Sequence, residues 1–160
     1  MDTRLSTEGL NAMLTRRRTW DPGSWPARTD RPRVLVEDPD GAVRDAMRRL
    51  LEREGFDVAL CSGPQDMGRR ECPAVRGEGC ALAAGADVVY TSLADADTQS
   101  REVVGALRTL YPDTPLVTEI PQPKHRELAE SLDGCHVTYV PVGRHEMTAA
   151  IRAALDGRSA

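Results

Sequence analysis

Aromatic residues are scarce in this chain of 160 residues, where Phe, Trp and Tyr together make up 4%. This scarcity argues against nucleic-acid recognition by stacking, because such surfaces present aromatic rings to successive bases. An excess of positive charge is also lacking, since the net charge is −4. Phosphate backbones bind to clustered basic surfaces. We therefore do not expect a nucleic-acid coat protein.

Long apolar runs are absent as well. No stretch approaches the ~20 apolar residues needed to cross a bilayer, and the polar N-terminus has no apolar core of a signal peptide. We therefore expect no membrane contact and a cytoplasmic location. The chain has four cysteines, which we expect to be reduced in that compartment.

The sequence divides into an N-terminal extension with a linker, residues 1–32, and one domain, residues 33–156. The extension holds an apolar triplet at helical spacing and then a basic cluster: Leu10, Met13, Leu14, Arg16, Arg17 and Arg18. The stretch "DPGSWPARTDRP" that follows has no periodicity and is typical of a linker. Two interpretations remain open, a loosely attached tail or a segment that docks on a partner or on the domain. Trp20 and Trp25 favour docking, since large aromatic side chains seldom stay exposed without a use.

From Arg33 onward, short apolar stretches alternate with amphipathic ones. Strands are expected over 33–37, 56–61, 87–93, 115–120 and 136–142. Asp38 or Asp40 is expected to cap the first helix, which Gly55 ends. Helical spacing predicts that the following residues face the core: Val43, Met47, Leu50, Leu51, Val103, Val104, Leu107, Leu110, Leu128, Ala129, Leu132, Met147, Ile151, Ala154 and Leu155.

This alternation predicts parallel strands joined by right-handed helical crossovers. We expect an α/β fold of flavodoxin type, a doubly wound five-stranded parallel sheet of order 2-1-3-4-5 with helices on both faces. In such sheets the functional site lies beyond the carboxyl ends of the strands, where the strand order reverses. Glu37 and Asp38 end the first strand and are expected at that point.

The chain resembles the receiver domain of bacterial response regulators. The resemblance covers about residues 33–156 and rests on "VLVEDPDGAVRDAMRRLLEREGFDV", on "DTPLV" before the fourth strand and on "YVPV" in the fifth. It implies two acids that hold Mg²⁺, an aspartate that accepts a phosphoryl group, a hydroxyl residue, and a lysine before a proline. Transferred one at a time, these positions fall on Glu37, Asp38, Ser92, Ile120, Val140 and Pro141.

Three of those positions have lost the residue that the mechanism uses. The hydroxyl of Ser92 is not ionised at neutral pH, as a carboxylate nucleophile is. Mg²⁺ binds weakly to the two carboxylates that remain. We therefore expect no phosphorylation at the usual position, and neither Mg²⁺ nor any other cofactor, with the acids serving either in a weak metal site or in helix capping. Asp95 and Asp97 are alternative acceptors if the register is shifted.

Three cysteines fall within twenty residues: Cys61 ends the second expected strand, and Cys72 and Cys80 lie on the connection 62–84 that follows. Their spacing matches no standard zinc or iron–sulfur motif, so they are either small apolar or incidental thiols, or a redox or metal-binding group. We expect them to fasten this glycine-rich connection. Cys135 belongs to the opposite edge of the sheet. Nearby arginines are expected to lower the thiol pKa values: Arg69, Arg70 and Arg76.

Two functional hypotheses follow. The first is a non-enzymatic, receiver-like signalling module that binds a protein partner or forms a homodimer. The resemblance implies that it uses the face of the fourth helix, fifth strand and fifth helix, where Tyr139, Arg144, His145 and Glu146 lie. Direct DNA binding is not expected, because no DNA-binding domain follows the last helix. The alternative is a thiol-based redox or metal-sensing module on the same scaffold.

Overall fold

The computed structural model describes residues 24–66, 72–93 and 98–158. Five parallel strands form one sheet in the order β2-β1-β3-β4-β5. The strands are β1 (Arg33–Glu37), β2 (Asp57–Cys61), β3 (Val88–Ser92), β4 (Leu116–Pro121) and β5 (His136–Val140). The predicted flavodoxin-like fold and its strand order are confirmed, because every neighbouring pair of strands is parallel and the order is the expected one.

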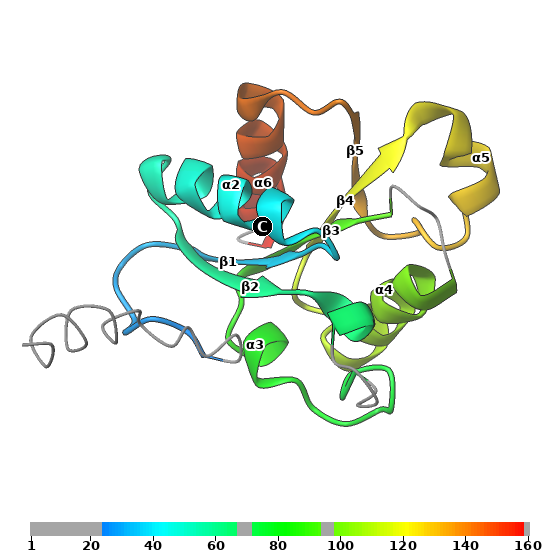
Figure 1. Ribbon diagram of the computed structural model, residues 1–160, viewed down its shortest axis with the longest axis horizontal. Coiled ribbons are helices and arrows are strands. Elements are labelled where there is room, and N and C mark those ends of the chain that lie inside the picture. The colour runs from blue at the N-terminus through cyan, green and yellow to red at the C-terminus, as the bar shows by residue number, and fades with distance from the viewer. Residues whose placement is uncertain (1–23, 67–71, 94–97, 159–160) are drawn as a thin grey trace, which may run out of the picture.

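Helices cover both faces of the sheet (Figure 1). They are α2 (Gly41–Arg53), α3 (Ala81–Ala84), α4 (Thr98–Leu110), α5 (His125–Leu128) and α6 (Arg144–Arg158), with 3-10 turns η1 (Gly63–Asp66) and η2 (Gln122–Lys124). In the view of Figure 1, α2 and α6 lie above the sheet, and α3 and α4 lie below it. In the described ranges, no helix combines the length and apolar character that a bilayer crossing requires.

Helix α2 begins and ends where its sequence predicts. The Asp40 carboxylate accepts hydrogen bonds from the N–H groups of Ala42 and Val43 at 2.8 and 3.3 Å. Gly55, with φ of 91°, follows the C-terminal cap, as is common at helix ends. The prediction that Val43 faces the core is wrong, because this side chain is 41% exposed. It lies in the first turn of α2.

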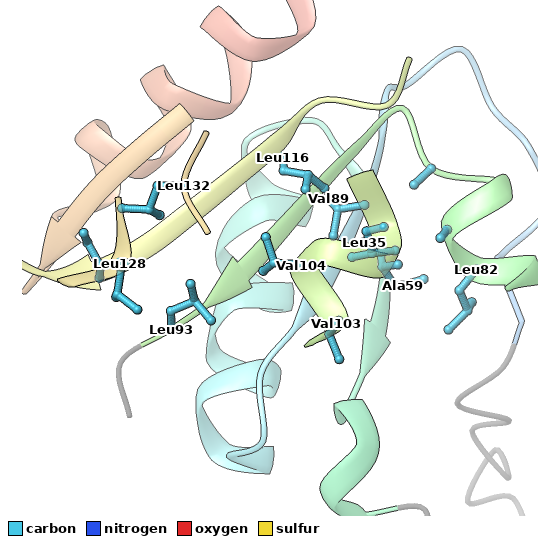
Figure 2. Close-up of a cluster of buried hydrophobic side chains, with 14 residues drawn as sticks. Leu35, Ala59, Leu82, Val89, Leu93, Val103, Val104, Leu116, Leu128 and Leu132 are labelled. Carbon is cyan, nitrogen blue, oxygen red and sulfur yellow. The ribbon is translucent and has the colours of Figure 1, made fainter. Parts of the chain in front are cut away.

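Two apolar clusters pack against the two faces of the sheet. The cluster shown in Figure 2 joins strand residues such as Leu35 and Val89 to Val104 and Leu107 of α4. The other packs α2 and α6 onto the opposite face through residues such as Leu51. Most residues predicted to face the core belong to these clusters. Two further exceptions are Ala129, which follows the last residue of α5 and is exposed, and Leu110, which is half-buried and belongs to neither cluster.

Residues 24–32, here called the N-terminal strap, contact the domain through Trp25. Its indole Nε1–H donates a hydrogen bond to the carbonyl of Leu82 in α3 at 2.9 Å. The Arg33 guanidinium lies 5.1 Å from the centroid of the Trp25 ring. Gly85 leaves the space that the indole fills, because a Cβ at that position would lie 2.6 Å from Nε1. Trp25 therefore docks on the domain itself, whereas Trp20 and the apolar and basic residues before it lie outside the described residues.

The described residues of the connection between β2 and β3 form the short elements η1 and α3 and a turn over 73–77, and no long helix, as the glycines and prolines predict. This connection is held by Tyr111 at the end of α4. The N–H of Cys80 donates to the Tyr111 hydroxyl at 2.6 Å, and that hydroxyl donates to the carbonyl of Cys80 at 3.0 Å. All four cysteines are free thiols. The expected link through the cysteines is thus not found. The Tyr111 hydroxyl instead hydrogen-bonds the backbone of Cys80, directly before α3.

Candidate functional site

The two acids at the end of β1 serve opposite faces of the sheet. Side chains alternate along a strand, and Glu37 shares its face with Leu35, on the side of α4. Asp38 comes one residue later, and its charge acts on Tyr90 and Glu119, whose side chains lie on the α2 and α6 side. The weak metal role expected for this pair stays a prediction.

The Glu37 carboxylate is enclosed by protein. The side chain is 4% exposed, and its Oε2 accepts a hydrogen bond from the hydroxyl of Thr91 on the neighbouring strand. Gly63 closes the other side, with φ of 70°, and any Cβ at that position would overlap Oε1 of Glu37. Glu37 is thus a buried acid, and its carboxylate occupies space that only a glycine at position 63 leaves free.

Asp38 and Asp40 organise the junction between β1 and α2. Oδ1 of Asp38 accepts a hydrogen bond from the N–H of Asp40 at 2.7 Å, and the Asp38 N–H donates to the carbonyl of Cys61 at 3.1 Å. Arg44 donates to the carbonyls of Asp38 and Pro39 at 2.5 and 3.0 Å. Of the two predicted capping residues, Asp40 caps the helix, and Asp38 stabilises the turn before it.

The three other positions implied by the resemblance hold no group that replaces the expected one. Ser92 ends β3, lies opposite Glu119 of β4 and is half-buried. Ile120 is 0% exposed and belongs to the core. Val140 ends β5 and precedes Pro141 through a cis peptide bond. The alternative acceptors Asp95 and Asp97 lie outside the described residues.

Sequence reasoning missed Glu119, which the sheet places beside these positions. Ser92 pairs with Glu119, and Glu119 pairs with Thr138, while Asp38 follows Glu37 one step beyond the Glu37–Thr91 pair. The Tyr90 hydroxyl donates to Oε2 of Glu119 at 2.5 Å. We call Asp38, Tyr90, Ser92, Glu119 and Thr138 the carboxyl-end row. Its signal in the sequence is an acid in the otherwise apolar strand "PLVTEI".

The carboxyl-end row perturbs the acidities of its members. Burial raises the pKa of Glu119 above its ordinary value, and the negative charge of Asp38 raises it further, while the hydrogen bond from Tyr90 partly opposes both effects. Burial, together with Glu119, raises the pKa of Tyr90, so the phenol stays protonated and donates. Thr138 is 4% exposed, and its hydrogen bond with the Tyr90 phenol opposes part of the increase in the pKa of Tyr90.

The thiols differ from the sequence-based expectation. Burial raises the pKa of Cys61 to about 11, with a smaller increase from Glu37 and a partial decrease from the hydrogen bond of the Gly63 N–H. The predicted lowering by arginines is wrong for Cys61. Arg76 instead pairs with Glu78 at 2.7 Å, and Arg69 and Arg70 lie outside the described residues. In the described part of the chain, no three His, Cys, Asp or Glu side chains are placed to hold a metal ion.

The face predicted to bind a partner is largely exposed, although Tyr139 at its centre is half-buried. His125 of α5 and Tyr139 of β5 form a hydrogen bond between Nδ1 and the hydroxyl at 2.7 Å, and their ring centroids are 5.8 Å apart. Arg144 and His145 begin α6 and are exposed. This face is formed by the edge strand β5 and by the first residues of α5 and α6.

Comparison with known proteins identifies the fold. No family model matches the sequence, and no curated protein matches it. Among solved structures, a response regulator receiver domain protein from Clostridium thermocellum is 18% identical with a TM-score of 0.63, and the match covers 80% of this chain and 97% of that one. A CheY-like receiver domain protein from Methanospirillum hungatei JF-1 is 16% identical with a TM-score of 0.60, over 81% and 97% of the two chains.

The same fold occurs in proteins with other descriptions. A structure described as adenylate cyclase from Rhodopirellula baltica is 15% identical with a TM-score of 0.62, and the match covers 81% of this chain and 90% of that one. Such low identities show the fold and leave the activity open. With five parallel strands in the order 2-1-3-4-5 and helices on both faces, the chain has the fold of response regulator receiver domains.

Proposed function

We propose that this chain is a receiver-like signal-transduction module that acts through protein contacts and is not phosphorylated at the usual position. The observation that carries the proposal is the replacement of the acceptor, hydroxyl and lysine positions by Ser92, Ile120 and Val140 on an intact receiver fold. Phosphoryl transfer in receiver domains depends on a carboxylate nucleophile and on cations that neutralise the incoming charge. A serine hydroxyl and two aliphatic side chains supply none of these.

The surface that supports partner binding is the exposed face of α5, β5 and the start of α6. Receiver domains generally interact with other proteins, and we assign the contact here to Tyr139, His125 and Arg144. A homodimer through the same face is the other form of this proposal. We further propose that the module has no catalytic activity of its own, takes no cofactor, does not bind DNA directly and works in the cytoplasm.

Beryllium fluoride with Mg²⁺, which mimics a bound phosphoryl group, tests the signalling part of the proposal. We expect the amide NMR signals of Ser92 and Leu93 to stay unchanged during the titration. Saturable shifts at these residues would show that an acceptor carboxylate operates nearby and would contradict the proposal.

The thiol-based alternative is weaker. The thiolate is the reactive form of a cysteine, and a pKa of about 11 leaves about one Cys61 in ten thousand ionised at pH 7. Counting free thiols after mild oxidation separates the two functions. We expect all four cysteines to remain titratable. Loss of two thiols without intermolecular dimers would favour the redox alternative through Cys61, Cys72 or Cys80.

A further inference from the structure

Three aspartates of the chain are followed directly by a glycine, and the fold gives each pair different surroundings. The aspartates are Asp40, Asp133 and Asp156. Such a pair is chemically reactive, because the backbone nitrogen of the glycine can attack the side-chain carboxyl of the aspartate. Glycine favours this ring closure, since it has no Cβ to obstruct the approach and its backbone rotates freely. The fold therefore decides which of the three pairs can react.

The first pair is held by the start of a helix. The Asp40 carboxylate caps α2 and accepts the N–H groups of Ala42 and Val43 at 2.8 and 3.3 Å. Gly41, which carries the attacking nitrogen, is the first residue of that helix. Attack on the carboxyl carbon of Asp40 would first have to break both cap hydrogen bonds.

The last pair lies inside α6, which ends one residue after it. Within a helix, each N–H group donates to the carbonyl four residues earlier, and the nitrogen of Gly157 is held in this way. Ring closure at Asp156 would require the last turn of α6 to unwind. Helix ends fray, so this pair is protected less strongly than the first.

The middle pair lies in the turn that leads from α5 to β5 and has no such protection. The Asp133 side chain is 83% exposed, and Gly134 is exposed with a φ of 73°. The Gly134 N–H donates no hydrogen bond within the part of the chain that the structure describes. The Asp133 carboxylate pairs with the Arg108 guanidinium at 3.2 Å, and exposed ion pairs of this kind contribute little.

We infer that Asp133 is a site of spontaneous covalent modification, at which the aspartate isomerises to isoaspartate. The Gly134 nitrogen attacks Cγ of Asp133 and loses its proton, the carboxyl hydroxyl leaves as water, and a cyclic succinimide forms. Water then adds to the main-chain carbonyl carbon of Asp133, and the bond from that carbon to the nitrogen breaks. The main chain now runs through the former side chain and ends the reaction with a free α-carboxylate. One water leaves and one enters, so no other reactant is needed.

The modification changes the approach to β5. It lengthens the main chain by one carbon atom between two constrained residues. Leu132 is 6% exposed and belongs to the core, and its carbonyl accepts the N–H of Cys135 at 2.9 Å. Cys135 directly precedes β5. The isomerised turn therefore alters the entry into the strand that carries the exposed face of α5, β5 and α6.

Asparagine variants make the three pairs comparable. Asparagine forms the same succinimide but releases ammonia, so the reaction appears as a change in intact mass. Asp133→Asn, Asp40→Asn and Asp156→Asn are each incubated as the whole folded chain and again in urea. We expect folded Asp133→Asn to deamidate about tenfold faster than Asp40→Asn and about threefold faster than Asp156→Asn, because the latter two must first break cap bonds or unwind a helical turn. In urea the three rates should be similar.

The parent chain provides a test without any substitution. After incubation in water enriched in oxygen-18 and proteolytic digestion, we expect the heavy oxygen in the peptide that contains Asp133, and far less in those that contain Asp40 and Asp156. Asp133→Glu, which cannot close the five-membered ring, should abolish this incorporation. Equal incorporation at the three aspartates would overturn the inference. So would a folded Asp133→Asn chain that deamidates no faster than Asp40→Asn, since the turn would then protect its aspartate as well as the helix cap does.

Discussion

Replacing Trp25 with alanine should lower the free energy of unfolding, although this residue precedes the sheet in the sequence. Aromatic-to-alanine changes in a packed core cost about 3–5 kcal/mol, and a half-buried ring loses part of that amount. The hydrogen bond to Leu82 at 2.9 Å contributes about 1 kcal/mol. The contact with Arg33 at 5.1 Å adds about 0.5–1 kcal/mol. Together these contributions give a loss of about 2–4 kcal/mol.

Urea denaturation of the whole chain, followed by far-ultraviolet circular dichroism, measures the loss. Trp25→Phe keeps a ring and removes the N–H donor, so it should lose less stability, about 1–2 kcal/mol. Gly85→Ala should destabilise the protein by a comparable amount in the chain that keeps Trp25, because its Cβ would lie 2.6 Å from the indole nitrogen. In the Trp25→Ala background the same change should be nearly neutral. A Trp25→Ala variant within about 0.5 kcal/mol of the parent, the range of ordinary surface substitutions, would show that the strap does not hold α3.

Three further predictions concern the sheet and its carboxyl end. Gly63→Ala should destabilise the fold by more than about 2 kcal/mol, because its φ of 70° disfavours a Cβ that would also meet Glu37; a milder loss in urea denaturation would contradict the enclosed position of Glu37. Glu119→Gln should raise the melting temperature at pH 7–8 and have little effect near pH 4, since a raised pKa of the folded-state carboxyl makes stability fall as pH rises from the unfolded pKa through the folded one; an unchanged difference across this range would refute the shift. Leu107→Ala should cost about 2–4 kcal/mol and Val43→Ala less than about 1 kcal/mol, because Leu107 is 4% and Val43 41% exposed; equal losses would contradict the assigned packing.

Local patterns in the sequence were sufficient for most of the fold. The spacing of Val103, Val104 and Leu107 predicts α4 and its buried side, and Asp40 and Gly55 mark the two ends of α2. These features depend on residues within one or two helical turns. Val43 follows the same spacing and is nevertheless 41% exposed, because helical spacing does not determine which turns of a helix are covered by other elements.

Features that join distant segments were not predictable in this way. The position of the Trp25 side chain depends on its contacts with Leu82 and Gly85, about sixty residues later in the chain. The environment of Glu119 depends on the strand register that places it beside Ser92 and Thr138. Burial decides the acidity of Cys61, and its sequence neighbours suggested the opposite sign.

Intact-mass analysis after incubation with acetyl phosphate and Mg²⁺ tests the central claim most directly. The receiver fold carries Ser92, Ile120 and Val140 where phosphoryl transfer requires a carboxylate, a hydroxyl and an amine. We predict that the mass of the chain stays unchanged under conditions in which a receiver domain with an aspartate acceptor gains one phosphoryl group. A hydroxylamine-labile phosphoryl adduct would contradict the account and would identify a carboxylate acceptor, with Asp95 and Asp97 as the first residues to replace.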